Sequence, residues 1–339
     1  MKRVAFIDHS FHKKSLAFEF LKDILKKNYI VDEYWDDSWD NGKKIEPNDV
    51  NGKEYDCVFF AQIFPSEEFI EQLECKNVIW MPMYDSEVTG GFVRALRLLK
   101  YDVKILSFSL FQHKKYLSFG LDSTYAQFFT KPEKKLKNLK NKEVTVYYWP
   151  RSESISWKTV KKLLGKNFNG KVIIHNVPDP KNTFVMPSAE DVKEYNIKFI
   201  NEWLSKDQVI KERIKADIFI APRVYEGIGM AFLEAMSGGC AVISPNNPTM
   251  NEYIEDNNTG YLYNIHQPRS IDLSNLKKVK ASTYKYMVKG YNKWIKKDYR
   301  KPLELIEKPY KANANIFTYA NIFITLTISK IQKLIRNIM

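Results

Sequence analysis

Residues 216–244 read ADIFIAPRVYEGIGMAFLEAMSGGCAVIS, and this stretch decides the fold class. The apolar run at 217–221 predicts a buried strand, because short apolar runs bounded by turn residues are typical of parallel sheets. A helical segment of small and apolar residues follows at 229–237, and a second apolar run follows at 240–244. A strand, a helix and a strand in this order predict a βαβ unit.

The same alternation extends over the whole chain of 339 residues, a length that favours two domains. Strands are predicted at 3–7, 29–34, 56–61, 77–81, 103–108, 144–148, 171–175, 217–221, 240–244 and 260–263. Helices are predicted at 15–27, 66–74, 91–100, 156–164, 206–215, 229–237, 249–255 and 284–297. We therefore predict an α/β protein of two Rossmann-like doubly wound domains, an N-terminal one at 1–130 and a C-terminal one at 144–300. A lysine-rich linker at 131–143 would join them, and a crossover and amphipathic tail would follow at 301–339.

Composition excludes several classes of protein. Hydrophobic residues at 44% and charged residues at 27% argue against general disorder. The cysteines Cys57, Cys75 and Cys240 form no CxxC pair and no zinc-site spacing, which favours a reducing, cytoplasmic compartment. The opening MKRVAFIDHS is too short and wrongly flanked for a signal peptide, and no apolar run reaches the roughly 18 residues that a membrane span needs.

The net charge of +13 comes mainly from scattered lysines. Lysine is a point charge and a poor reader of base edges, so we expect no nucleic-acid partner. An anionic membrane surface or an anionic acceptor explains the sign, and so does a simple solvated lysine-rich surface.

Glu234 is the only charged residue between Gly227 and Asn251. A buried carboxylate without a partner is costly, so Glu234 needs a basic neighbour or a ligand that carries hydroxyl groups. Just before its helix, Gly227 and Gly229 allow close approach to the backbone, and the free N–H groups of the helix start favour an anion. The alternative for these glycines is a simple tight turn.

Glu226 and Glu234 form an E-x7-E pair, followed by NEYI and then by Gly260, Tyr261 and Leu262. Over about 215–263 this pattern resembles the donor-site signature of the retaining GT-B glycosyltransferases grouped as family 4. The resemblance implies two Rossmann-like domains that face each other across a cleft. It also implies a nucleotide-sugar donor site in the C-terminal domain and an acceptor site in the N-terminal domain.

Roles for particular residues follow from the resemblance. Glu234 resembles the carboxylate that binds the ribose hydroxyls, and Glu226 resembles the one that contacts the transferred sugar. The backbone of Gly227 and the amides of Ile228, Gly229 and Met230 would lie by the diphosphate. Arg151 and Lys158 look like the two cations that clamp it, so we expect no metal cofactor. Surface charge is the other interpretation of these two cations.

Several positions depart from the family pattern. Ala241 stands for the common Pro, Asn247 and Pro248 for a Gly-Gly pair, and Arg223 for the usual Ser. Because these positions shape the pocket beside the donor sugar, they put the identity of the sugar in doubt more than the activity. Residues 8–10, Asp-His-Ser, also replace the usual Gly-Gly after the first strand, so the resemblance of this half concerns the architecture only.

Candidates for the acceptor side follow strands of the N-terminal half: His9, His12, Asp85 and His113. Asp85 is the strongest of them, and we assign it a catalytic role beside Glu226, although each of these side chains also suits a helix cap. His175 ends a strand and is expected to border the nucleotide. The acidic loop at 36–40 superficially resembles a DxD metal site, but a solvated turn explains it better.

The function implied is transfer of a sugar from a nucleoside diphosphate sugar to a glycan or lipid-linked acceptor, with retention, in polysaccharide or glycoconjugate synthesis. The alternatives are an epimerase or phosphorylase of the same fold, or a non-catalytic partner of a transferase. In the tail, Ile324, Ile328, Ile331 and Ile335 recur at helical spacing beside basic residues. Such a helix either lies on an anionic membrane, which would make the protein peripheral, or packs on a domain.

Overall fold

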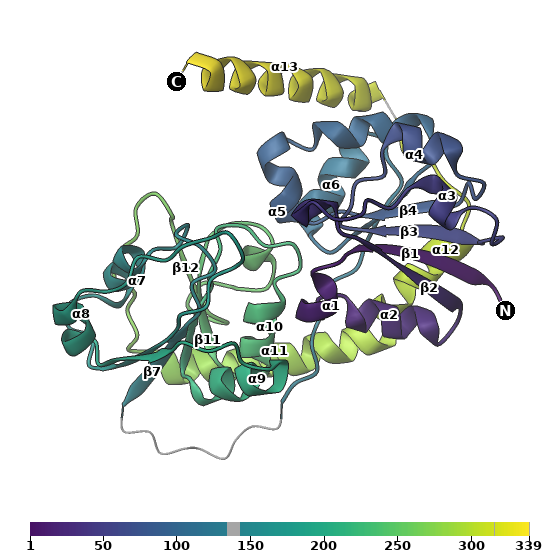
Figure 1. Ribbon diagram of the computed structural model, residues 1–339. Helices are drawn as coiled ribbons and strands as arrows, with labels where there is room; N and C mark the ends of the chain where they lie inside the picture. Colours follow the sequence, from purple (N-terminus) through teal and green to yellow (C-terminus); the bar gives the residue numbers. More distant parts are fainter. Residues whose placement is uncertain (134–142, 315, 339) are drawn as a thin grey trace. The chain divides into compact units, whose positions relative to one another are not determined.

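The chain forms two units, each built around one six-stranded sheet. The first unit comprises Met1–Phe128 and Lys296–Met339, and the second comprises Phe129–Ile295 (Figure 1). The computed structural model describes residues 1–133, 143–314 and 316–338. The predicted α/β class with two Rossmann-like doubly wound domains is confirmed. Most of the predicted linker at 131–143 lies outside the described residues.

The sheet of the first unit has the strand order β2-β1-β3-β4-β5-β6, and its paired strands run parallel. From β1 the chain builds β2 on one side and β3 on the other. The carboxyl ends of β1 and β3 thus flank the topological switch point, where open α/β sheets bind ligands. The strands are β1 (Arg3–His9), β2 (Ile30–Asp36), β3 (Cys57–Ala61), β4 (Val78–Met81), β5 (Lys104–Ser107) and β6 (Ser123–Tyr125).

The second sheet has the order β12-β11-β10-β7-β8-β9, again parallel. Here the switch point lies between β7 and β10, because β8 and β9 extend the sheet on one side of β7 and β10 starts the other side. Loops that follow β7 and β10 are therefore the expected place for a ligand. The strands are β7 (Val144–Tyr148), β8 (Gly170–His175), β9 (Ile197–Ile200), β10 (Ile218–Ile220), β11 (Ala241–Pro245) and β12 (Tyr261–Tyr263).

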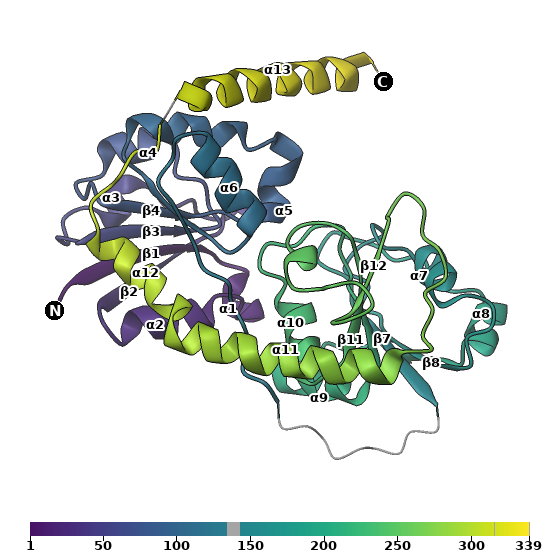
Figure 2. The same cartoon turned by 180° about the vertical axis from the view of Figure 1, so that it is seen from behind.

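Helices flank each sheet (Figures 1 and 2). The helices of the first unit include α1 (His12–Ser15), α2 (Glu19–Lys26), α3 (Pro47–Val50), α4 (Glu67–Gln72), α5 (Tyr84–Glu87), the 3₁₀ helix η3 (Val93–Lys100), α6 (Leu110–Ser118), α12 (Lys301–Glu307) and α13 (Ile316–Ile338). Those of the second unit are α7 (Trp157–Leu164), α8 (Ala189–Glu194), α9 (Lys206–Lys215), α10 (Met230–Ser237) and α11 (Leu276–Lys296), which ends at the unit boundary. Serine side chains cap the starts of α4, α6, α7, α8 and α9, which explains why these helices begin where they do.

Apolar periodicity located most of the strands and helices, and several elements differ from their prediction. The predicted helix at 91–100 is the 3₁₀ helix η3, which begins after Gly91 and Phe92 in left-handed conformations. The predicted helix at 249–255 is only a 3₁₀ turn at Met250–Glu252. Strands β6 and β9 carry too few residues to show a period, and α11 begins eight residues before its predicted start at 284.

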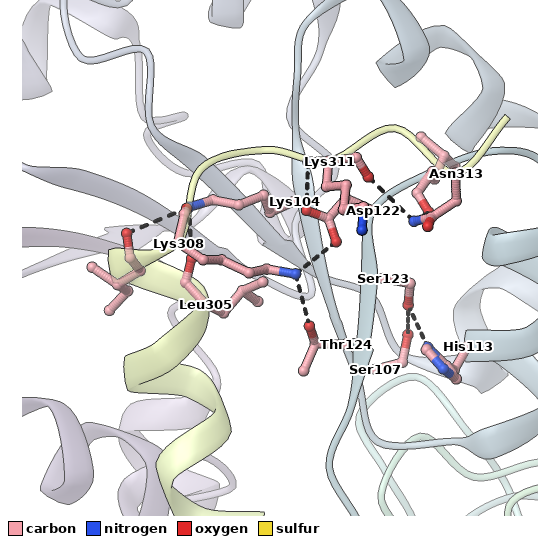
Figure 3. A network of polar contacts seen from close by, with 12 residues as sticks. Lys104, Ser107, His113, Asp122, Ser123, Thr124, Leu305, Lys308, Lys311 and Asn313 are labelled. Atoms are coloured by element: carbon pink, nitrogen blue, oxygen red, sulfur yellow. Dashed lines mark hydrogen bonds and ion pairs between the residues drawn. The ribbon is translucent and has the colours of Figure 1, made fainter.

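The last part of the chain is fixed to the first unit by a buried lysine. Lys104 on β5 is 3% exposed, and its ammonium donates to the carbonyls of Leu305 at 2.6 Å and Lys308 at 2.7 Å (Figure 3). Lys308 in turn donates to Asp122 at 2.7 Å. The last carbonyls of a helix have no partner within it, and Lys104 supplies hydrogen-bond donors to those at the end of α12. In return, these carbonyls offset part of the cost of burying the Lys104 ammonium.

Helix α13 packs on the first unit through polar side chains and exposes apolar ones. Its Thr318 and Thr325 are buried, and the ammonium of Lys115 on α6 donates to Thr325 at 3.0 Å. Its large apolar side chains are exposed instead: Phe317, Phe323, Ile324, Leu326, Ile328, Ile331 and Ile335. Within the described part of the chain, no helix is both long enough and apolar enough to cross a bilayer.

His113 on α6 is expected to make the first unit sensitive to acid. Burial, together with nearby lysines, lowers the pKa of His113 to about 4, and its Nδ1 lies 2.9 Å from the hydroxyl of Ser123 (Figure 3). Unfolded histidine titrates near pH 6.5, so between about pH 6.5 and 4 the unfolded chain binds a proton that the folded chain does not. Stability should therefore decrease as the pH is lowered through this window. Urea unfolding at pH 7.5 and 4.5 should show a smaller loss in His113→Gln than in the wild type; equal losses would contradict this.

Candidate functional site in the second unit

The loop between β10 and α10 forms the centre of the candidate site. Its Gly229 has a φ of +81°, and a Cβ at this position would lie 1.9 Å from the Phe232 ring. Only glycine suits this position, because a left-handed conformation and a close side chain coincide there. Gly227 and Ile228 are buried with it, while Met230 begins the helix half-buried. The backbone start of α10 is thus held in one conformation.

Thr249 and Asn247 fix this loop, and Asn247 is one of the positions that depart from the family pattern. The hydroxyl of Thr249 donates to the carbonyls of Glu226 at 2.8 Å and Gly227 at 3.0 Å. The amide of Asn247 donates to the carbonyl of Val224 at 3.1 Å. The sequence indicated that this segment shapes a sugar pocket; the contacts assign it the further task of positioning the 224–227 backbone.

Arg151 and Arg223 share one carboxylate at the switch point. Arg151 follows β7, Arg223 follows β10, and both guanidinium groups pair with Asp179, which follows β8. The Arg151 guanidinium also lies 4.3 Å above the Trp149 ring, and the Asp179 amide donates to the Arg151 carbonyl at 2.9 Å. Asp179 is not among the residues predicted from the sequence. The signal that could have indicated it is its position in HNVPDP, shortly after a strand.

Charge and burial oppose each other in this group. Burial lowers the pKa of Arg151, while the carboxylates of Asp179 and Glu226 act in the opposite direction. Glu226 is 8% exposed, so Arg151 lies within electrostatic reach of a second buried acid. Lys158, the other predicted clamp cation, is exposed in the first turn of α7, and Arg151 and Arg223 rather than Lys158 pair with Asp179.

Glu234 on α10 has a buried partner. Its carboxylate pairs with Arg213 of α9, and this guanidinium also donates to the carbonyl of Ala231 at 3.0 Å. Glu234 and Arg213 are 9% and 5% exposed. The basic neighbour that the sequence required is therefore present as an arginine, and the ribose role of Glu234 stays a prediction. Arg213 is not predicted from the sequence, because an arginine in a helix rich in charged residues is normally expected to be exposed to solvent.

His175 is a buried structural histidine. Its Nδ1 lies 2.8 Å from the Tyr147 hydroxyl and its Nε2 lies 3.0 Å from the Glu202 carbonyl, so both ring nitrogens are engaged. The ring stacks on Trp149 at 4.4 Å, and burial lowers its pKa. A role at the border of the nucleotide stays a prediction. Because both ring nitrogens are engaged, any contact with a nucleotide would come from a residue packed against the His175 ring, such as Trp149.

In the first unit, His9 and His12 lie at the carboxyl end of β1. Nδ1 of His12 lies 2.7 Å from the buried carboxylate of Asp8, and His9 stacks on Trp39 at 5.0 Å. Burial lowers the pKa of His9. These polar groups stand beside the switch point of this sheet, which is the position expected for an acceptor site.

Asp85 and the acidic loop at 36–40 are further candidates in the first unit. Asp85 is half-buried in α5 and accepts from the Ser86 amide at 3.0 Å. In the 36–40 loop, Asp36 is 7% exposed and accepts from the amides of Ser38 at 3.1 Å and Ile45 at 2.9 Å. Asp36 thus organises the turn. Among the described residues, no three His, Cys, Asp or Glu side chains gather where they could hold a metal ion.

A comparison with known protein families gives a match within the second unit. The family model "Glycosyl transferases group 1" matches residues 192–274, which include the loop after β10 and all of α10. A search of curated protein sequences returned no match.

Solved structures resemble the chain in fold. The chain is similar to HepE of Anabaena in complex with UDP and glucose, at a TM-score of 0.60 and 11% identity, over 90% of this chain and 99% of that one. It also resembles sucrose-phosphate synthase of Thermosynechococcus elongatus, at 0.56 and 12% over 100% of both chains. A third neighbour is WaaG, a glycosyltransferase involved in lipopolysaccharide biosynthesis, at 0.51 and 13% over 90% and 98%.

Proposed function

We propose that this chain moves a sugar from a nucleoside diphosphate sugar to a glycan or lipid-linked acceptor. It is a glycosyltransferase with the GT-B fold, and its segment 192–274 matches the family model of the group 1 glycosyl transferases. One observation carries the proposal. Arg151 and the start of α10 follow the strands at the switch point of the second sheet, where Glu226 is also buried. Cations, free N–H groups and a carboxylate are the groups that a sugar diphosphate needs.

These groups match the charges of the reaction. The acceptor hydroxyl oxygen forms a bond to the anomeric carbon, and the bond from that carbon to the diphosphate oxygen breaks. The electron pair leaves with the diphosphate, so fixed cations and a helix start stabilise it. With retention, the leaving phosphate oxygen takes the acceptor proton. Glu226 holds hydroxyls of the transferred sugar, and Glu234 holds those of the ribose.

The donor and the pathway are the finer parts of the proposal. HepE was solved with UDP-glucose, so a UDP-hexose is the first donor to try, for an acceptor in polysaccharide or glycoconjugate synthesis. An epimerase or phosphorylase of this fold would also bind such a donor, and a non-catalytic partner would bind without turnover. Donor turnover with an acceptor separates these alternatives.

Release of nucleoside diphosphate tests the proposal. UDP- and GDP-sugars would be incubated with extracted glycans and lipid-linked sugars, and the released UDP or GDP quantified by chromatography. The wild type should release product in an acceptor-dependent way, and Glu226→Gln should lose most of this rate. Glu190→Gln, which changes an exposed carboxylate of α8, is the matched control. Rates that are equal in Glu226→Gln and the wild type would refute the role of Glu226.

Activity should persist without divalent metal ions. Arg151, Lys158 and the α10 start would supply the positive charge that a metal gives to the leaving diphosphate in other transferases. Initial rates would be measured after dialysis against EDTA and after addition of Mg²⁺ or Mn²⁺. The rates should agree within about twofold, whereas complete loss with EDTA and recovery with either metal would overturn this expectation.

Helix α13 is proposed to bind the cytoplasmic face of an anionic membrane. Its exposed isoleucines provide an apolar surface, and the net charge of +13 favours anionic lipid. Near such a surface each lysine contributes about 1 kcal/mol, and salt should weaken binding. The full chain should co-sediment with phosphatidylserine-containing vesicles at low salt. Replacing Ile324, Ile328 and Ile331 by Asn should release it.

The control for this prediction changes apolar side chains that are exposed elsewhere. Val185 and Met186 of the second unit are 67% and 44% exposed, and their replacement by Asn should leave sedimentation unchanged. If the wild type stays in the supernatant at low salt, α13 binds no membrane. If the triple variant sediments like the wild type, the lysine-rich surface alone is responsible.

A further inference from the structure

Two arginines, Arg151 and Arg223, share the carboxylate of Asp179. Two guanidinium groups contact Asp179, whose side chain is 18% exposed, and the arginine side chains are 17% and 36% exposed. Because like charges this close repel each other, two negative charges are needed to balance the two guanidinium groups. The buried Glu226 lies within electrostatic reach of Arg151 and supplies a second negative charge.

The two guanidinium groups are also pre-positioned. On one side, the Asp179 amide binds the Arg151 carbonyl, and the Trp149 ring lies under the Arg151 guanidinium. On the other side, the residue after Arg223 is fixed by the hydrogen bond from Asn247 to the Val224 carbonyl. Planar arginine forks held in place are suited to bind phosphate oxygens, and they lose little freedom when they do so.

We propose that Arg223 binds the donor diphosphate together with Arg151, and that Asp179 is a positioning residue that holds both guanidinium groups. As a departure from the family pattern, Arg223 is predicted to lie beside the donor sugar. Its pairing with the carboxylate that also holds Arg151 places it with the phosphate-binding cation. The inference rests on the proposed function, because it names the part of the donor that this residue recognises.

Three probes of increasing size distinguish the phosphates from the rest of the donor. Calorimetric titrations would compare uridine, UDP and UDP-glucose, and guanosine, GDP and GDP-mannose. In Arg223→Gln, affinity for the nucleoside diphosphate should fall about 10- to 100-fold, the scale of a charged hydrogen bond, while nucleoside affinity stays within about threefold. Arg223→Lys keeps the charge without the fork and should recover part of the loss.

Asp179→Asn separates positioning from simple charge. Removal of a negative charge near an anion site should strengthen diphosphate binding if Asp179 acts only through its charge. If Asp179 holds the guanidinium groups in place, binding should weaken by about 10-fold even though the site becomes more positive. Thermal unfolding of each variant without ligand confirms that it is folded. Arg269→Gln, at an exposed position of the same unit, is the matched control.

The outcomes separate this inference from the proposed function. If the wild type binds none of the probes, both fail. If it binds UDP or GDP and Arg223→Gln binds equally well, only the inference fails. A loss confined to the sugar conjugates would place Arg223 beside the sugar, and tighter binding by Asp179→Asn would refute the positioning role.

Discussion

Replacement of Glu234 by alanine should destabilise the second unit by about 3–5 kcal/mol, because it leaves the Arg213 guanidinium buried without its charge partner. The effect on folding should exceed the direct effect on nucleotide binding, which we place at about 1.5–3 kcal/mol, the scale of a charged hydrogen bond. Urea unfolding monitored by circular dichroism measures the former, and titration with nucleotide measures the latter.

Two further variants test the cause of this loss. Glu234→Gln retains a hydrogen-bond acceptor for Arg213 and is the variant in which to measure nucleotide affinity. The double replacement Glu234→Leu with Arg213→Met removes both charges and should recover much of the stability, since an apolar pair of similar volume often substitutes for a buried ion pair. A Glu234→Ala protein as stable as the wild type would show that the pair is not buried in solution.

The second large effect is expected at Gly229. In Gly229→Ala the new methyl group would meet the Phe232 ring at 1.9 Å, in a backbone conformation with φ of +81°. Overpacking costs about 1–3 kcal/mol and a left-handed alanine costs about 1–2 kcal/mol more. Because relief of the clash must displace the start of α10, donor turnover should fall by at least about 10-fold in the protein that remains folded.

Gly90→Ala is the control for this substitution. No atom lies within 4 Å of a Cβ at Gly90, and its φ is not positive. Unfolding and turnover of Gly90→Ala should match the wild type. Normal turnover and stability in Gly229→Ala would mean that the loop after β10 adopts a different conformation in solution.

The sequence predicted the fold where local patterns carry the information. Strands such as β1 and β11 are built around continuous apolar runs, and α9 begins at a serine with a capping box, so neighbouring residues are enough to predict each of them. Strand β6, with the sequence STY, is specified by its pairing with β5, and that pairing depends on residues far apart in the chain.

The candidate site divides in the same way. The glycines and glutamates of the β10 loop lie close together in sequence and form a pattern. Asp179 and Arg213 lie 44 and 21 residues from the groups they hold, Arg223 and Glu234. Only the order of strands β10, β7 and β8 brings Arg223, Arg151 and Asp179 together, so the partners that fix the charge of the site could not be inferred from local spacing.

Hydrogen exchange with and without nucleoside diphosphate tests the central claim most directly. The full chain would be labelled alone and with saturating UDP or GDP, whichever raises its melting temperature, since a ligand that binds the native state stabilises it. We predict slower exchange at 223–237 and 149–158, around the ends of β10 and β7. Protection confined to the first unit, or no protection and no shift in melting temperature with either nucleotide, would contradict a donor site in the second unit.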